Sequence, residues 1–262
     1  AGAKAITVVT AGFKEVGGEG IEREARLLER VAHYGMRMVG PNCMGILNTE
    51  PEYRLNATFA PSFPPAGPTC FLSQSGAMGV TILDYAKEYG IGIHHFASVG
   101  NKADVNGNDL LEHWEHDPGA KVVLMYLENF GEPRRFTRIA RRFTRSKPIV
   151  VVKAGRTKSG ARAAASHTGA LGGVDVAIDA LLAQCGVLRA GSVQELFDIA
   201  MALEEQPIPR GNRVAIVTNA GGPGIMIADA CEAHGLEVVE QLKETQARLV
   251  EVFPAEASVR NP

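Results

Sequence analysis

The sequence predicts an α/β protein in which parallel sheets are covered by crossover helices. Short β-branched runs alternate with longer segments of helical periodicity along the 262 residues. Many of the 29 glycines end an apolar run, where such a protein turns from strand to helix. The length suffices for more than one hydrophobic core, so we expect two compact units and part of a third.

The first segment, residues 1–66, has the pattern strand, helix, strand. The strands are expected at 5–9 and 37–39, and the helix at 19–34, where apolar side chains recur at helical spacing. Residues 48–68 hold five prolines, and we interpret this stretch as a linker.

The second segment, residues 67–207, contains five strands that are each followed by a helix. That arrangement is a complete flavodoxin-like sandwich, with helices on both faces of one parallel sheet. The expected strands are 69–72, 95–99, 122–127, 149–153 and 187–188, and the expected helices are 77–89, 108–116, 132–144, 174–185 and 193–206.

The third segment, residues 208–262, starts another unit of the same kind. We expect a strand at 214–218, a glycine loop, a helix from about 224 to 234, and a strand at 236–239. Two strands bury too little apolar surface for an independent core. Since the chain also lacks an initiator Met, we expect it to be a piece of a longer protein, truncated at both ends.

Composition excludes several function classes. The formal charge of −2 gives no electrostatic footprint for nucleic acid or an anionic membrane. The basic stretch 134–145 has apolar residues at helical spacing, so we interpret it as a solvated helix face. No apolar run approaches the ~18 residues of a membrane span. The four cysteines form no CxxC pair, which favours buried thiols in a reducing cytoplasm over disulfides or a zinc site.

Three strand-to-helix junctions combine glycine with small polar residues. Free N–H groups and the positive end of a helix dipole make such a junction suitable for a phosphate. Any one of them alone is equally well explained as an N-cap with a tight turn, but three in one chain favour phosphate binding. The junctions are 73–76 (SQSG), 166–169 (SHTG) and 219–224 (NAGGPG).

His167 differs from the other six histidines because it lies inside one of these junctions. The helix dipole disfavours a protonated imidazole there, so the ring is expected to be neutral and nucleophilic toward a phosphoryl group. Such a histidine needs its second ring nitrogen oriented, usually by a carboxylate. Glu128 directly follows the apolar strand at 122–127 and is the candidate, although a lone glutamate there is more often a surface loop residue.

Familiar nucleotide and hydrolase motifs are absent. There is no GxxxxGK[ST] loop, the glycines at 221–224 do not complete GxGxxG, and SQSGA lacks the first glycine of GxSxG. His113 and His116 are not part of an HExxH motif, and we predict no metal site.

Five motifs occur here in the order found in ADP-forming acetyl-CoA synthetases, which are similar to the α chain of succinyl-CoA synthetase. The resemblance covers nearly the whole chain and implies a partial Rossmann-like CoA-binding domain, a flavodoxin-like ligase domain and the start of a second one. The motifs are GPNCMGI (40–46), LSQSGA (72–77), YLENFG (126–131), SHTGALGG (166–173) and TNAGGPG (218–224).

The resemblance implies a role for each motif residue. His167 would be the transient phosphohistidine, and Glu128 its hydrogen-bonding glutamate. The helices after 169 and near 222–224 would point their N-termini at the phosphate. The implied phosphate-binding residues are Ser73, Ser75, Gly76, Ser166, Thr168, Gly169, Gly221, Gly222 and Gly224, and the implied CoA-binding residues are Val9, Thr10, Ala11 and Asn42. Ala11 departs from succinyl-CoA synthetase, which usually has a glutamate there.

The implied reaction converts acyl-CoA, phosphate and NDP into acid, CoA and NTP through an acyl phosphate and a phosphohistidine. CoA and phosphate would bind this chain. ADP or ATP and Mg²⁺ would need an ATP-grasp domain or β subunit as the partner, so the isolated chain is expected to be inactive.

Two other classes of function stay open. One is a non-catalytic, acyl-CoA-sensing region of a bacterial protein acetyltransferase, which often carries a degenerate histidine loop. The histidine and the glutamate present here favour catalysis. The other is a flavodoxin-like redox domain, which is disfavoured because no aromatic pair flanks a hydroxyl-rich phosphate loop.

Overall fold

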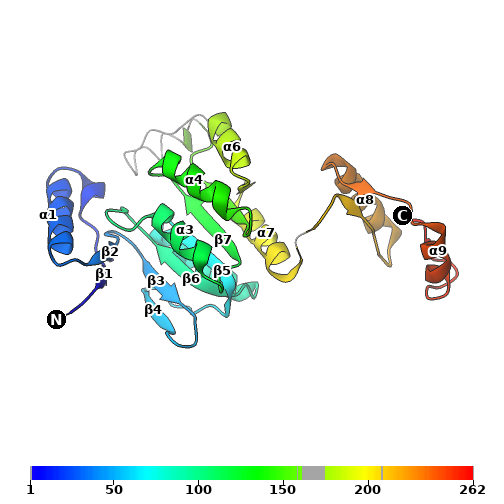
Figure 1. Cartoon of the computed structure of the whole chain (residues 1–262), viewed down its shortest axis with the longest axis horizontal. Coiled ribbons are helices and arrows are strands. Elements are labelled where there is room, and N and C mark those ends of the chain that lie inside the picture. The colour runs from blue at the N-terminus through cyan, green and yellow to red at the C-terminus, as the bar shows by residue number, and fades with distance from the viewer. Residues whose placement is uncertain (1, 158, 161–174, 208, 262) are drawn as a thin grey trace. The chain divides into compact units, whose positions relative to one another are not determined.

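The computed structural model describes residues 2–157, 159–160, 175–207 and 209–261 (Figure 1). Its contacts divide the chain into two compact units, residues 1–206 and residues 207–262.

The chain begins with a small parallel sheet. Strand β1 (Ala5–Thr7) pairs in parallel with β2 (Arg37–Val39). The 3-10 turn η1 (Lys14–Val16) and helix α1 (Glu19–His33) connect them. The predicted strand, helix and strand of the first segment are therefore confirmed.

A seven-stranded sheet has the order β4-β3-β6-β5-β7-β8-β9, and its last five strands are parallel. The five predicted strand–helix pairs are all present. The strands are β5 (Ala66–Ser73), β6 (Ile93–Ser98), β7 (Val122–Leu127), β8 (Ile149–Lys153) and β9 (Leu188–Ala190), and the helices are α2 (Gly76–Glu88), α3 (Gly107–His116), α4 (Pro133–Phe143), α6 (Asp175–Gln184) and α7 (Val193–Glu205).

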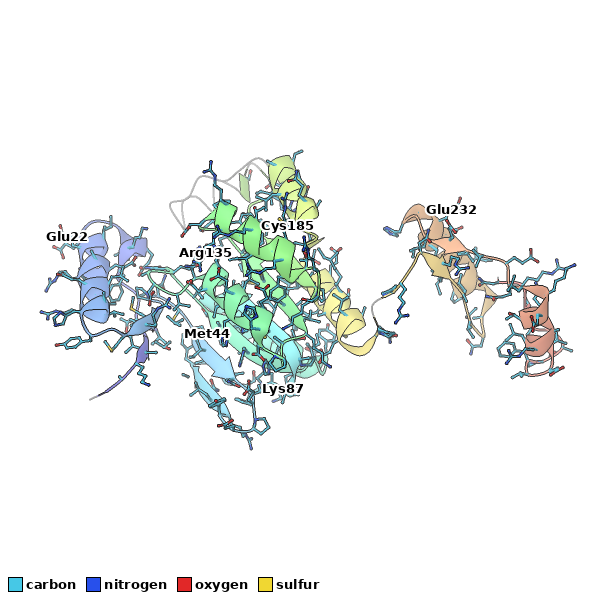
Figure 2. All side chains as sticks on the ribbon, in the orientation of Figure 1. Glu22, Met44, Lys87, Arg135, Cys185 and Glu232 are labelled. Carbon is cyan, nitrogen blue, oxygen red and sulfur yellow. The ribbon has the colours of Figure 1, made fainter. Side chains whose placement is uncertain are left out.

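Two apolar cores lie on opposite faces of this sheet. Helices α3, α4 and α6 supply one core, which includes Cys185, and α2 and α7 supply the other, which includes Met44 (Figure 2). Helix α4 buries Phe136, Ile139, Ala140 and Phe143 and turns its arginines outward, which confirms the interpretation of 134–145 as a solvated helix face.

The linker interpretation of residues 48–68 was wrong for part of that stretch. Strand β3 (Gly45–Asn48) pairs antiparallel with both β6 and β4 (Leu55–Thr58), and extends the large sheet beyond β6. Pro51, Pro61, Pro64 and Pro65 lie outside strands β3, β4 and β5, and Pro68 lies within β5 where its pairing with β6 is irregular, between Ala66 and Thr69. At Gly45 a Cβ atom would lie 2.0 Å from the Ala57 carbonyl oxygen, so this pairing requires glycine.

The second unit has two short parallel strands, β10 (Arg213–Val214) and β11 (Glu237–Val238), connected by α8 (Gly221–Ala233). Helix α8 begins three residues earlier than expected, and the sequence did not predict α9 (Lys243–Val250). The Asn261 side chain accepts a hydrogen bond from the Ile216 N–H. Its amide nitrogen donates to the carbonyl of Val214, the last residue of β10, and to that of Val239, which directly follows β11.

All four cysteines are buried free thiols, as predicted. Among the described helices, none is both long and apolar enough to cross a lipid bilayer.

Candidate functional site

The junction between β5 and α2 is held by its two serines. Ser73 is fully buried; its hydroxyl donates to the Ser75 carbonyl oxygen at 2.7 Å and accepts the Ser75 N–H at 3.2 Å. The Ser75 side chain caps the helix by accepting the Met78 N–H. Gly76 starts α2 at the carboxyl edge of the sheet. The Ser73 hydroxyl thus closes a tight turn and the Ser75 hydroxyl caps the helix, as the explanation without phosphate expects. A phosphate contact by either serine stays a prediction.

Gln74 joins this junction to the segment after β7. Its side-chain oxygen accepts the N–H groups of Glu128 (2.8 Å) and Asn129 (3.0 Å), and its amide nitrogen donates to the Asn129 carbonyl at 2.7 Å. Strands β5 and β7 are neighbours, so one side chain spans the gap between them. The predicted residues Glu128 and Gly76 are thereby brought to the same edge of the sheet. Sequence reasoning missed Gln74, whose signal was an amide between two serines at a strand end.

A second missed residue is Lys102, in the loop between β6 and α3. Its ammonium donates to Asn129 Oδ1 at 2.6 Å. Burial lowers the pKa of Lys102 to about 8, an effect that Glu128 partly offsets and Lys14 adds to. A partly buried cation that interacts with Glu128 is a group that binds anions.

An amide and carboxylate network fastens the small sheet to this loop. Asn101 donates from its amide nitrogen to Glu15 Oε2 (2.6 Å) and Glu24 Oε2 (2.8 Å), and accepts from Asn42 at 3.2 Å. Burial raises the pKa of Glu15, but the hydrogen bonds from Asn101 and from the N–H groups of Gly12 and Phe13 outweigh it, so the pKa lies below its ordinary value. Glu15 is therefore an anion that holds the two parts together.

These groups line one cleft of about 790 Å³, which separates η1 from the carboxyl edge of the large sheet. Its lining contains both polar and apolar residues. The polar residues include Asn42, Gln74, Asn101, Lys102, Glu128 and Asn129, and the apolar ones include Met125, Leu127, Phe130 and Phe136.

The residues assigned to CoA lie next to this cleft. Val9, Thr10 and Ala11 are exposed in the segment after β1. Asn42 adopts a left-handed φ of 55°, donates from its N–H to the Thr10 carbonyl at 3.0 Å, and lines the cleft. The structure thus brings Asn42 to the exposed segment, and CoA binding by these residues stays a prediction.

The remaining predicted residues fall into two groups. Ser166, His167, Thr168 and Gly169 lie outside the described residues. Gly221, Gly222 and Gly224 lie in the first turn of α8, in the second unit. A Cβ atom on Gly221 or Gly222 would have no neighbour within 4 Å, so this helix start is open to solvent.

Two other histidines have partners that the sequence did not reveal. His94 Nε2 lies 3.0 Å from Asp117 and 3.2 Å from Glu50, and the His95 ring stacks on His94. These side chains are close enough to surround a cation. However, the Trp114 indole N–H donates to His95 Nδ1 at 3.1 Å. Burial, together with the electrostatic effect of the neighbouring His94, lowers the pKa of His95 to about 4. His95 Nε2 then carries the proton of the neutral ring, which makes the cluster a hydrogen-bond network.

Comparison with known proteins assigns the residues that form most of the large sheet to one family. Residues 66–203 match the succinyl-CoA ligase like flavodoxin domain. The chain is 44% identical over 255 residues to an ADP-forming acetate–CoA ligase of Archaeoglobus fulgidus, covering 97% of this chain and 37% of that protein. It is 42% identical over 261 residues to an ADP-forming acetate–CoA ligase α subunit of Pyrococcus furiosus, covering 56% of that subunit.

A solved structure shares the whole fold. It is the dinucleotide-forming acetyl-coenzyme A synthetase 1 of Ca. Korarchaeum cryptofilum in complex with phosphate and ADP, with a TM-score of 0.91 and 42% identity over 99% of this chain and 55% of that one. The chain therefore spans between about a third and somewhat more than half of the relatives it matches.

Proposed function

Because the chain belongs to the family of succinyl-CoA ligase like flavodoxin domains found in ADP-forming acetate–CoA ligases, we propose that it carries the phosphohistidine step of an acyl-CoA synthetase. The observation that carries the proposal is Glu128, held by Gln74 at the carboxyl edge of the sheet beside the start of α2. Gln74 holds the backbone N–H of Glu128, and a carboxylate on a backbone anchored there is suited to orienting an imidazole.

The proposed reaction has three balanced steps. A phosphate oxygen attacks the thioester carbonyl and expels CoA, which leaves an acyl phosphate. His167 then attacks the phosphorus, the P–O bond to the acyl group breaks, and the acid leaves. ADP finally takes the phosphoryl group from His167 and becomes ATP.

Each part of the chain has a task in these steps. Glu128 accepts a hydrogen bond from one ring nitrogen of His167 and leaves the other free to attack. The start of α2 binds the phosphoryl group with its backbone N–H donors. Residues 166–169 and residues 221–224 are each proposed as a further phosphate-binding segment. Val9–Ala11 and Asn42 bind CoA. Mg²⁺ and ADP are held by an ATP-grasp domain or subunit. The acid is a product in this direction and a substrate in the reverse direction.

The regulatory alternative has less support. The relatives named above are ligases and a synthetase, and none is an acetyltransferase. A chain that only sensed acyl-CoA would not need Glu128 fixed at the carboxyl edge of the sheet.

The division of tasks between this chain and its partner can be tested by complementation. We expect the purified chain, given acetyl-CoA, phosphate, ADP and Mg²⁺, to form no ATP. Adding the ATP-grasp part, fused or in trans, should restore ATP formation, because the nucleotide then has a binding site. A coupled ATP assay measures both. ATP formation by the chain alone would contradict the assignment of the nucleotide to the partner.

A further inference from the structure

Lys102 makes fewer hydrogen bonds to the described residues than Lys147, another partly buried lysine. Lys147 donates to two backbone carbonyls, at Trp114 and Asp117, and so closes the end of α3. Among the described residues, the Lys102 ammonium donates to one neutral amide oxygen, on Asn129. An ammonium has three donors, so Lys102 can still donate to a ligand in the cleft.

The backbone holds Lys102 in place from two sides. Its φ of 56° is in the left-handed region, which lysine seldom adopts. A Cβ atom on Gly100 would lie 2.2 Å from the Pro41 carbonyl oxygen, so the loop is packed tightly on residues 40–42. Asn101 and Ala103 donate their N–H groups to the Pro41 and Gly40 carbonyls. The ammonium therefore projects from a rigid base.

We propose that Lys102 binds the carboxylate of the acid substrate in the cleft, beside Glu128. The inference rests on the proposed function and adds to it a residue that none of the motifs contains. In the direction of acyl-CoA synthesis, a carboxylate must approach a phosphohistidine that is itself anionic. A cation at that point offsets the repulsion between the two anions.

The cleft fits an acid in this orientation. Lys102 and Asn129 line it and would hold the carboxylate. The half-buried Phe130, with the more deeply buried Met125 and Leu127, belongs to the same lining and offers apolar contact to the rest of the molecule. The charged residues that line the cleft with Lys102 are Glu128 after β7, Lys14 and Glu15 on η1, and Glu132 at the start of α4. Of these, Glu128 raises the pKa of Lys102 and Lys14 lowers it, and a bound carboxylate would act in the same direction as Glu128.

The pKa of Lys102, about 8, gives the proposal a second readout. Below that pH the ammonium is charged and binds the acid. Above it the charged fraction falls about tenfold for each pH unit, and the KM for the acid should rise accordingly. Arginine stays charged throughout this range, so a Lys102→Arg variant should lose this rise.

The test measures the KM for acetate and for phosphate in the complete protein with its nucleotide-binding partner, between pH 6.5 and 9.5. We expect Lys102→Met to raise the KM for acetate about 10-fold or more, the range for a charge-assisted hydrogen bond. The KM for phosphate should change less than about 2-fold. The matched control is Lys87→Met, an exposed lysine on α2 (Figure 2), which should leave both constants unchanged.

Three outcomes would overturn the inference: an unchanged KM for acetate in Lys102→Met, an equal rise in the KM for phosphate, or a Lys102→Arg variant that keeps the wild-type pH dependence. The arginine variant retains the charge, so it decides the matter if the methionine variant does not fold. Failure of the proposed function gives a different result, because the unmodified protein would then not convert acetate, ATP and CoA at all.

Discussion

Replacing His167 with asparagine should abolish covalent phosphorylation of the chain. The reason is chemical, since an amide nitrogen has no lone pair free to attack phosphorus, whereas a neutral imidazole does. Incubation with radiolabelled acetyl phosphate, or with ATP and the nucleotide-binding partner, should label the unmodified protein. The label should be lost in acid and kept in alkali, as expected for a phosphoramidate.

The exposed His33, at the end of α1, supplies the control. A His33→Asn variant should be labelled like the unmodified protein, which rules out a general effect of losing a histidine. If the His167→Asn variant kept its label, another residue would be the phosphate carrier.

The second large effect is expected at Glu128. Replacing it with glutamine should slow His167 phosphorylation about 10²-fold or more, the scale of a positioned acid–base partner. Glutamine keeps the size of the side chain, but it cannot offer the charged acceptor that orients the imidazole. Because Gln74 binds the backbone N–H of Glu128 and not its carboxylate, the loop should keep its conformation. Rapid-quench measurement of labelling gives the rate.

Glu88→Gln, at the exposed end of α2, is the matched control and should leave the rate unchanged. Equal melting temperatures of the two variants would show that folding is intact. A Glu128→Gln protein that is labelled at the normal rate would make this glutamate an ordinary loop residue.

Much of the fold was predictable because its signals are local. A buried parallel strand is a short β-branched run, and each run here is followed by a helical pattern, several of which end at a glycine such as Gly35, Gly90 or Gly186. The pairing of β3 and β4 was not predictable. It depends on the close approach of Gly45 to Ala57, two residues that no local pattern connects, and the prolines around them suggested a linker.

The residues of the site also differ in whether a local sequence pattern or a tertiary contact reveals them. Glu128 follows a strand of apolar residues, so its charge stands out in the sequence. Lys102 is surrounded by other polar residues, and its position depends on the packing of residues 100–103 against residues 40–42. Gln74 could be recognised only after β5 and β7 were known to be neighbours. Tertiary contacts, and not local patterns, define these two residues.

The fate of the phosphate oxygens tests the proposed chemistry most directly. The complete protein, with its nucleotide-binding partner, would be given acetyl-CoA, ADP, Mg²⁺ and phosphate labelled with ¹⁸O at all positions, and the products would be analysed by mass spectrometry. If phosphate attacks the thioester and His167 then takes the phosphoryl group, the bridging oxygen stays with the acyl group. The acetate should therefore carry a single ¹⁸O and the γ-phosphate of ATP the other three. Acetate without ¹⁸O would contradict an acyl phosphate intermediate and, with it, the proposed function.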